Sequence, residues 1–203
     1  MLGDNMKYIG VIGRNNDKIT YNKEIIDVIY NYNCIPICIS LRFLDDYEKE
    51  FTLIKPLLDM CDGFILQGGS EFYNIDILIV KYLHNNDIPT LGICLGMQTM
   101  ACAFNGILNN IDEHNSNEKY VHNIIINKKS KLYKIINKDE ISVNSRHNEY
   151  VYNTDLEKSS YSNILESIED SNKKFFIGVQ WHPESLMDKN SILLFNSFFF
   201  SIN

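Results

Sequence analysis

A cysteine set between two glycines, where an apolar run gives way to helix-forming residues, is the feature that most constrains this fold. It lies in the stretch Thr90-Leu91-Gly92-Ile93-Cys94-Leu95-Gly96-Met97-Gln98. The pattern predicts a buried strand over Pro89–Ile93, a sharp turn at Cys94 and a helix over Met97–Phe104. Glycines two residues before and after the cysteine permit a tight turn and close packing of the strand against the helix.

Such a turn lifts the central side chain above the sheet, as the G-x-S-x-G pattern does for a serine nucleophile, and here cysteine replaces serine. The start of a helix adds a partial positive charge and free backbone N–H groups, which favour a thiolate. Free cysteines are also often buried and inert. The turn by itself therefore leaves Cys94 as either a nucleophile or a core residue.

Strand and helix patterns alternate through the first half of the chain. The predicted strands are Lys7–Gly13, Cys34–Ile39, Asp62–Leu66 and Pro89–Ile93, and the helices between them are Tyr21–Tyr32, Phe51–Met60 and Ile75–His84. This alternation predicts an α/β fold, an open and mostly parallel sheet with helices on both faces. A length of 203 residues without an internal repeat favours a single domain over residues 1–203.

The pattern changes after Phe104. Short β-like runs, separated by breaks rich in Asn and Lys, occur at Tyr120–Ile126, Leu132–Ile136 and Glu140–Val143. We expect these runs to add antiparallel strands at one edge of the sheet. Towards the end of the chain, Lys174–Gln180 predicts a last strong strand, and Ser191–Ser201 predicts a closing helix.

A second motif follows that last strand, in Gln180-Trp181-His182-Pro183-Glu184. On an extended backbone, residues two apart share a face, so His182 and Glu184 are expected side by side, with Pro183 fixing the bend. A carboxylate beside an imidazole fixes its tautomer and stabilises the imidazolium. Such a turn alone is usually only surface, but with Cys94 it completes a set of nucleophile, base and orienting group.

A pair of glycines, Gly68 and Gly69, ends the predicted strand Asp62–Leu66. Glycines at a strand end expose backbone N–H groups, and such a loop can supply one donor to an oxyanion. The N–H of Leu95, the residue after the cysteine, can supply the other donor. An ordinary Gly-Gly turn is the alternative interpretation.

Together these segments resemble the class I, triad-type glutamine amidotransferase superfamily. The matching residues are Gly92–Gln98, Gly68-Gly69 and Gly178–Glu184, and the resemblance extends from Lys7 to the last helix. It implies the flavodoxin-like fold of that superfamily.

The resemblance also implies roles for individual residues. Cys94 is the nucleophile, His182 the base and Glu184 its partner. Gln98 and Gly68 bind the substrate, with Gln98 on its glutamyl part. Gly69 and Leu95 form the oxyanion hole.

The segment Val143–Asn148 resembles the Asn-Ser-x-His-His-Gln stretch of the stand-alone γ-glutamyl hydrolase branch. That resemblance adds His147 to the candidate substrate-binding residues. The segment departs from the pattern at Asn148, so the role of Asn144–Asn148 stays open.

The chemistry that the resemblance implies is hydrolysis of a γ-glutamyl amide. Cys94 attacks the carbonyl, and His182 protonates the leaving nitrogen and then activates water to split a γ-glutamyl thioester. This reaction needs no cofactor and no metal, and the histidines show no metal-ligand spacing. The five histidines are His84, His114, His122, His147 and His182.

Three arginines, Arg14, Arg42 and Arg146, each follow a predicted strand. Ligands of open α/β sheets bind at the carboxyl ends of the strands, and a guanidinium binds carboxylate or phosphate in bidentate fashion. Surface arginines also simply fall in loops, which is the alternative. We expect an anionic, phosphorylated substrate, and the chain resembles the γ-glutamyl-CDP-amidate hydrolases of capsule biosynthesis, which would release glutamate and cytidine diphosphoramidate.

The net charge of −7 and the pI of about 5.2 argue against nucleic acid or an anionic membrane as a partner. The start MLGDNMKYIGVIG lacks the basic residues and apolar run of a signal peptide, and no later apolar run is long enough to cross a membrane. Five cysteines in such a chain favour reduced thiols and a cytoplasmic location. The oligomeric state stays open.

Three rival functions remain. The first is a glutaminase subunit that feeds ammonia to a synthase partner, although no synthase domain is fused here. The second is a hydrolase of another γ-glutamyl amine, such as a polyamine or folate conjugate. The third is a non-catalytic module that keeps the fold, which the presence of Cys94, His182 and Glu184 disfavours.

Overall fold

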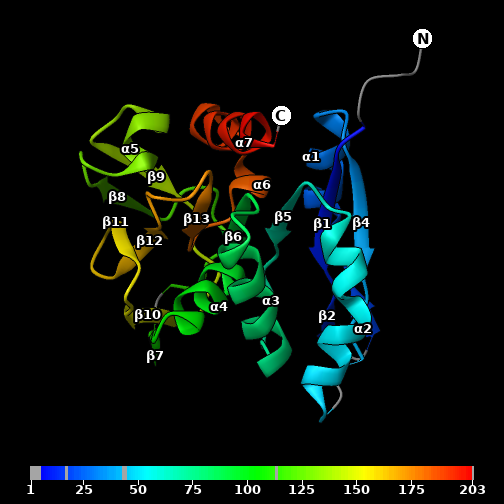
Figure 1. Ribbon diagram of the computed structural model, residues 1–203. Helices are drawn as coiled ribbons and strands as arrows, with labels where there is room; N and C mark the ends of the chain where they lie inside the picture. The colour runs from blue at the N-terminus through cyan, green and yellow to red at the C-terminus, as the bar shows by residue number, and fades with distance from the viewer. Residues whose placement is uncertain (1–5, 17, 43–44, 113, 203) are drawn as a thin grey trace.

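The computed structural model describes residues 6–16, 18–42, 45–112 and 114–202. Within these residues the main sheet has nine strands (Figure 1). Its first half is parallel and consists, in spatial order, of β4 (Ile35–Ile39), β1 (Tyr8–Ile12), β5 (Gly63–Leu66), β6 (Thr90–Ile93) and β13 (Phe176–Val179).

The second half of the sheet is antiparallel. It continues from β13 through β12 (Leu165–Glu169), β11 (Glu157–Tyr161), β8 (His122–Ile126) and β9 (Glu140–Val143). Two small antiparallel pairs stand apart from it, β2 (Arg14–Asn16) with β3 (Lys18–Thr20), and β7 (Ile107–Asn110) with β10 (Glu149–Asn153).

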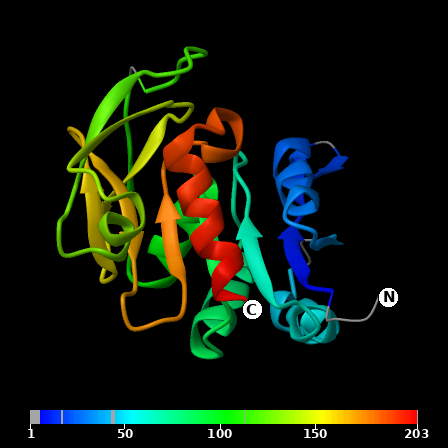
Figure 2. The same cartoon turned by 90° about the horizontal axis from the view of Figure 1, so that it is seen from above.

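Helices cover both faces of the sheet. On one face lie α1 (Lys23–Asn31), α5 (Lys131–Ile136), α6 (Pro183–Leu186) and α7 (Lys189–Ser201), whose apolar side chains share one core cluster. On the other face lie α2 (Tyr47–Asp59), α3 (Asn74–Asn85) and α4 (Leu95–Ala103), which share a second cluster. Figure 1 shows α5 and α7 above the sheet and α3 and α4 below it, and Figure 2 shows α7 lying across β13.

The central strands divide their side chains between these two cores. In β5, Phe64 and Leu66 join the cluster under α2, α3 and α4, whereas Ile65 joins the cluster under α1 and α7. Strands covered on both faces contain nearly continuous apolar residues, which is why the sequence pattern identified them. The predicted α/β fold, with its parallel sheet and antiparallel edge, is therefore confirmed.

One predicted strand is wrong, because Leu132–Ile136 belongs to helix α5. Ser130 caps this helix by accepting a hydrogen bond from the Tyr133 N–H, and Asn137 ends it in a left-handed conformation with φ of 54°. The Glu169 carboxylate accepts hydrogen bonds from the first backbone N–H groups of the helix, at 2.6 and 3.1 Å. A carboxylate at a helix N-terminus is stabilising, so tertiary contacts determine this short element.

Other differences concern boundaries and missed strands. The helix predicted from Phe51 begins at Tyr47, because the side chain of Asp46 accepts a hydrogen bond from the Lys49 N–H. Strands β11 and β12 were not predicted, and the serines along them are buried and hydrogen-bonded to one another across the pair. Such polar strands lack the apolar pattern on which the prediction depended.

The segments that carry the candidate residues meet at the carboxyl ends of the parallel strands. Residues 67–69 follow β5, Cys94 follows β6, and His182 comes three residues after β13. The residues Met1–Asn5, on which the absence of a signal peptide partly rests, lie outside the described residues. Among the described residues, every helix is too short or too polar to cross a lipid bilayer.

Candidate active site

Cys94 occupies a sharp turn between β6 and α4. Its backbone has φ of 53° and ψ of −107°, which residues with a side chain rarely adopt, so the turn is strained. A Cβ added at Gly96 would lie 2.1 Å from the Leu66 carbonyl oxygen, and one at Gly92 would lie 2.4 Å from the Met100 sulfur. The close packing predicted for both glycines is therefore confirmed, and it holds the strained turn in place.

The imidazole of His182 lies between Cys94 and Glu184. Its Nδ1 is 2.8 Å from Oε1 of Glu184, and its side chain also hydrogen-bonds the Cys94 side chain. Because Nδ1 is used by the carboxylate, Nε2 is the nitrogen that faces the thiol. The imidazole thus contacts both of the other predicted side chains.

The local geometry of the pair differs from the prediction. His182 and Glu184 do not alternate along a strand, because His182 is the N-cap of the short helix α6 and Glu184 lies in its first turn. Pro183, at the first helical position, has the fixed φ that suits a helix start. The two side chains therefore meet across a helix N-terminus.

The hydrogen bonds of His182 change its protonation. Burial alone would lower its pKa, but the hydrogen bonds to Cys94 and Glu184 and the negative charge of Glu184 outweigh burial and raise the pKa to about 10. The imidazolium is therefore favoured at neutral pH. An imidazolium beside a cysteine is the electrostatic environment that activates a thiol nucleophile.

Two residues that sequence reasoning missed support this pair. Asn22, the N-cap of α1, donates from Nδ2 to Oε1 of Glu184 at 3.3 Å, so one carboxylate oxygen accepts from two groups. The backbone N–H of Asn22 in turn donates to Oε1 of Gln67 at 2.6 Å. These contacts join α1, α6 and the loop after β5, and they could not be deduced from spacing along the chain.

The predicted oxyanion loop, Gly68-Gly69, lies against Cys94 and His182. A Cβ added at Gly68 would lie 3.0 Å from Cε1 of His182 and 3.6 Å from Cβ of Cys94. A Cβ added at Gly69 would lie 3.0 Å from Cδ2 of Leu95. The loop therefore packs closely against both the imidazole and the first residue of α4.

A cavity of about 210 Å³ opens beside the sulfur. Its lining residues are Gly69, Ser70, Cys94, Gln98, Arg146, His147, Asn148 and Glu149. It therefore contains four of the residues that the resemblance and the arginine pattern assign to substrate or oxyanion binding. They are Gly69, Gln98, Arg146 and His147.

The buried side chains of Gln98 and Gln180 form a chain of hydrogen bonds that ends at the sulfur of Cys94. Nε2 of Gln98 donates to the Glu149 carbonyl oxygen at 2.9 Å and to Oε1 of Gln180 at 3.4 Å. Nε2 of Gln180 donates to the sulfur of Cys94 at 3.7 Å. Gln180 belongs to the motif around His182, but its contact with Cys94 was not predicted.

The three arginines do not gather at the cavity. Arg146 lines it and donates to Oγ of Ser185 at 2.9 Å. Arg14 is only 3% exposed and forms an ion pair with Asp76 at 2.8 Å. Arg42 is exposed and does not line the cavity, and its backbone N–H donates to the carboxylate of Glu50.

The Asn144–Asn148 segment supports the site from a second side. Asn144 hydrogen-bonds the backbone of His182, and Nε2 of His147 lies 3.1 Å from Oγ of Ser145. Burial lowers the pKa of His147 to about 4, although the Glu166 charge and a hydrogen bond to the Glu149 carbonyl oxygen act in the opposite direction. The cavity wall at His147 is therefore uncharged at neutral pH.

Comparisons with known proteins agree with this geometry. A family model described as "Glutamine amidotransferase class-I" matches residues 17–202. The CTP synthase of Thermosipho africanus is 30% identical over 87% of this chain, and a glutamine-hydrolyzing GMP synthase subunit of Methanococcus aeolicus is 30% identical over 78%. This chain covers 42% of the length of that CTP synthase and 86% of that GMP synthase subunit.

Solved structures with low sequence identity share the fold. The glutaminase domain of the Trypanosoma brucei CTP synthase, with bound acivicin, has a TM-score of 0.68 at 18% identity, with 97% of this chain and 94% of that chain covered. A glutamine amidotransferase from Thermotoga maritima has a TM-score of 0.63 at 15% identity, with 96% and 91% covered.

Proposed function

Because this chain belongs to the class-I glutamine amidotransferase family, whose enzymes hydrolyse amides, we propose that it hydrolyses a γ-glutamyl amide by means of Cys94, His182 and Glu184. The observation that carries the proposal is the imidazole of His182, which is only 13% exposed and is hydrogen-bonded to the thiol on one side and the carboxylate on the other. Cys94 also lines the cavity that contains Gln98.

The proposed reaction begins with attack of the Cys94 sulfur on the side-chain amide carbonyl. The carbonyl oxygen becomes an oxyanion, which the backbone N–H groups of Gly69 and Leu95 stabilise, and one such donor is worth about 3–4 kcal/mol. His182 then gives its proton to the leaving nitrogen, so that the C–N bond breaks and a γ-glutamyl thioester forms. His182 next takes a proton from water, which attacks the thioester and releases glutamate.

Glutamine is the substrate that the cavity supports best. The cavity of about 210 Å³ is smaller than the roughly 300–1,000 Å³ of sites for drug-sized ligands, so it suits a group of amino-acid size. The matched relatives include CTP synthases and a glutamine-hydrolyzing GMP synthase subunit, and this chain covers most of the length of the latter. We infer that the chain is a glutaminase that passes ammonia to a synthase partner.

A second candidate substrate is a γ-glutamyl group carried on a phosphorylated leaving group, as in γ-glutamyl-CDP-amidate. The observation in its favour is the exposed guanidinium of Arg146 at the cavity that holds Cys94. A nucleotide would extend beyond the cavity and place its phosphates near that guanidinium. The buried ion pair of Arg14 with Asp76 gives this candidate no further support.

The test of the reaction class is glutamate release. The purified chain should release glutamate from glutamine or from a γ-glutamyl anilide, and Cys94→Ser should abolish release while the thermal unfolding temperature stays unchanged. Mass spectrometry of the quenched reaction should find a γ-glutamyl adduct on the peptide that contains Cys94. Equal glutamate release by the wild type and Cys94→Ser would refute the proposal.

The two candidate substrates can be distinguished by whether activity depends on a partner protein. A glutaminase subunit should co-elute with a larger protein from cell extract on gel filtration, and its glutaminase activity should peak in that fraction. A γ-glutamyl-CDP-amidate hydrolase should act on its substrate fully as the isolated chain. High activity of the isolated chain on that substrate, together with low activity on glutamine in every fraction, would exclude the glutaminase subunit.

A further inference from the structure

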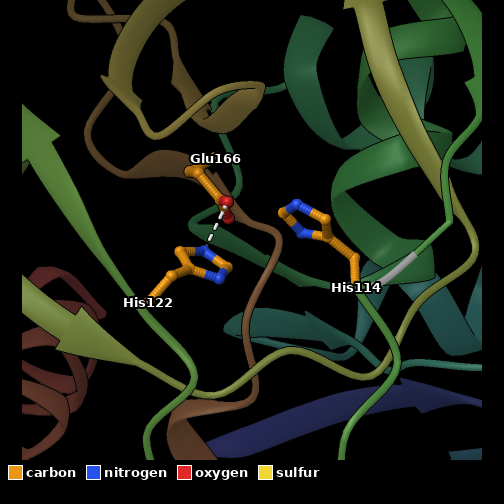
Figure 3. A group of neighbouring side chains, drawn as sticks. All are labelled: His114, His122 and Glu166. Carbon is orange, nitrogen blue, oxygen red and sulfur yellow. Dashed lines mark hydrogen bonds and ion pairs between the residues drawn. The ribbon is translucent and has the colours of Figure 1, made fainter.

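Two histidines and a glutamate meet on the antiparallel side of the sheet, away from the sulfur of Cys94. His114 lies between β7 and β8, His122 begins β8, and Glu166 lies in β12 (Figure 3). One ligand-type atom from each side chain lies within 4.8 Å of the other two. The three side chains are 7%, 20% and 1% exposed, respectively, so water competes weakly for them.

We propose that His114, His122 and Glu166 bind a divalent transition-metal ion, with Zn²⁺ as the best fit. Imidazole nitrogens and a carboxylate oxygen are common zinc ligands, and bonds of about 2.0–2.2 Å separate tetrahedral ligand atoms by about 3.3 Å. Nε2 of His122 and Oε1 of Glu166 are 2.7 Å apart and hydrogen-bonded (Figure 3). An ion would replace the shared proton of that bond, with small rotations of the three side chains.

Each of two ligands already has an outer hydrogen-bond partner, as ligands in metal sites usually do. Oγ of Ser145 lies 3.3 Å from Nδ1 of His114, and Oγ of Ser162 donates to Oε1 of Glu166 at 2.7 Å. These contacts fix the orientation of the ring and of the carboxylate. A preset orientation lowers the entropic cost of binding an ion.

The site is open on one side. A cavity of about 570 Å³ reaches both His114 and His122, and it is also lined by Asp112 and Ser162. This opening gives an ion a path to the three ligands and leaves room for a water molecule as the fourth. The expectation that this chain binds no metal rested on the absence of a short ligand spacing, whereas here the fold supplies the ligands from separate elements.

The proposed ion would stabilise the position of His147, which lines the Cys94 cavity. Ser145 hydrogen-bonds both His114 and His147, and His147 lines that cavity. The backbone N–H of Gln180 donates to the Glu166 carbonyl oxygen at 2.8 Å. The ion therefore takes no part in the proposed hydrolysis, and its contribution is structural.

The experiment measures Zn²⁺ binding by the full chain after dialysis against EDTA, in a Cys94→Ser background. That background removes the thiol of the Cys94–His182 pair, which could also hold zinc. Titration calorimetry should find one Zn²⁺ per chain, and saturating Zn²⁺ should raise the thermal unfolding temperature. His122→Gln should weaken binding by more than the roughly 10–100-fold that loss of an outer partner costs.

His84→Gln is the matched control. His84 also pairs with a carboxylate, with Nε2 2.8 Å from the half-buried Asp170, but this pair belongs to no group of three ligands among the described residues. Its zinc affinity should therefore match that of the parent. Circular dichroism of each variant shows whether it is folded, so that weaker binding through loss of a ligand is distinguished from weaker binding through unfolding.

Cobalt gives an independent readout. Co²⁺ bound at this site in the Cys94→Ser chain should show visible ligand-field bands and no thiolate charge-transfer band, and adding His122→Gln should remove those bands. The proposal is overturned if no Zn²⁺ binds to the folded chain with Cys94→Ser, or if His122→Gln binds as tightly as its parent. Glutamate release plays no part in these outcomes, so they are independent of the proposed hydrolysis.

Discussion

The side chain of Asn144 hydrogen-bonds both backbone polar groups of His182. Its Oδ1 accepts from the His182 N–H at 2.8 Å, and its Nδ2 donates to the His182 carbonyl oxygen at 3.0 Å. Asn144 is 1% exposed and follows β9, at the far edge of the sheet from β1. The antiparallel half of the sheet therefore positions His182, the proposed base, beside Cys94, the proposed nucleophile that follows a strand of the parallel half.

Asn144→Ala should lower kcat for glutamate release roughly 10–100-fold, with a smaller effect on KM, because a displaced base misaligns the proton transfer. Asn144→Asp keeps the acceptor but loses the donor, so it should lie between the wild type and alanine. The measurement is steady-state kinetics with a γ-glutamyl anilide. A reduced unfolding temperature is also expected, because each buried group left unpaired costs about 1–3 kcal/mol.

Asn86→Ala is the control for this effect. Asn86 also donates its side-chain amide to a backbone carbonyl, that of Tyr82 at 2.8 Å, but it is exposed at the end of α3. Its loss should leave kcat unchanged. A kcat for Asn144→Ala within twofold of the wild type would contradict the positioning role.

Gly68→Ala should remove activity while it spares stability. The added methyl group would lie 3.0 Å from the imidazole of His182, which must move by a few tenths of an ångström and so lose its alignment with Cys94. The φ of Gly68 is not positive, so alanine brings no backbone strain. Gly63→Ala is the matched control, because its methyl group would lie 2.9 Å from Ile202, in the core.

The two glycine variants should therefore differ in opposite ways. Thermal unfolding and glutamate release are measured for both. Gly63→Ala should unfold at a lower temperature and keep its activity per folded molecule. Gly68→Ala should unfold at the wild-type temperature and lose its activity. Full activity of Gly68→Ala would show that the added methyl group does not displace the imidazole of His182.

The stability of the chain should fall as the pH rises through the alkaline range. His182 has a pKa of about 10 in the folded chain against 6.5 ordinarily, so the folded state holds a proton that the unfolded state loses first. The stabilisation is complete below about pH 6.5 and is lost as the pH rises through about 10, with a slope near 1.4 kcal/mol per pH unit between them.

Urea unfolding of the wild type and of His182→Gln over this range measures the effect. The difference between their unfolding free energies should shrink as the pH rises, because only the wild type carries the proton of residue 182. Groups that do not contact residue 182 titrate in both proteins and cancel in the difference. Parallel curves would show that Glu184 and Cys94 do not hold His182 in its charged form.

The parallel half of the fold could be predicted because its strands are buried on both faces and so contain continuous apolar residues. The turn at Cys94 could be predicted because two glycines flank the cysteine in the sequence, and the structure shows their steric reason, close approach to Leu66 and Met100. By contrast, Leu132–Ile136 is a short apolar run, and such runs do not distinguish a strand from a helix. The Ser130 cap and the Glu169 carboxylate made it a helix.

The candidate site likewise contains some residues that could be predicted from the sequence and others that could not. Cys94, His182 and Glu184 were found because each lies in a local motif with chemical meaning. Asn144 and Gln180 act on these residues through long-range contacts that leave no spacing in the sequence. Likewise Arg14 follows β1 as predicted, but only the fold places it against Asp76.

Arg146 tests which leaving group the site accepts. Its guanidinium lines the Cys94 cavity, whereas Arg42, the other exposed arginine, does not, so Arg42→Gln is the control. If the substrate carries phosphate, Arg146→Gln should raise KM for γ-glutamyl-CDP-amidate about 10-fold or more, since a hydrogen bond to a charged group contributes about 1.5–3 kcal/mol. KM for a γ-glutamyl anilide should stay within twofold, because its leaving group has no charge to bind. An equal effect of Arg146→Gln on both substrates would instead assign the guanidinium to the glutamyl part or to its bond with Ser185, and the case for a phosphorylated substrate would lose its support.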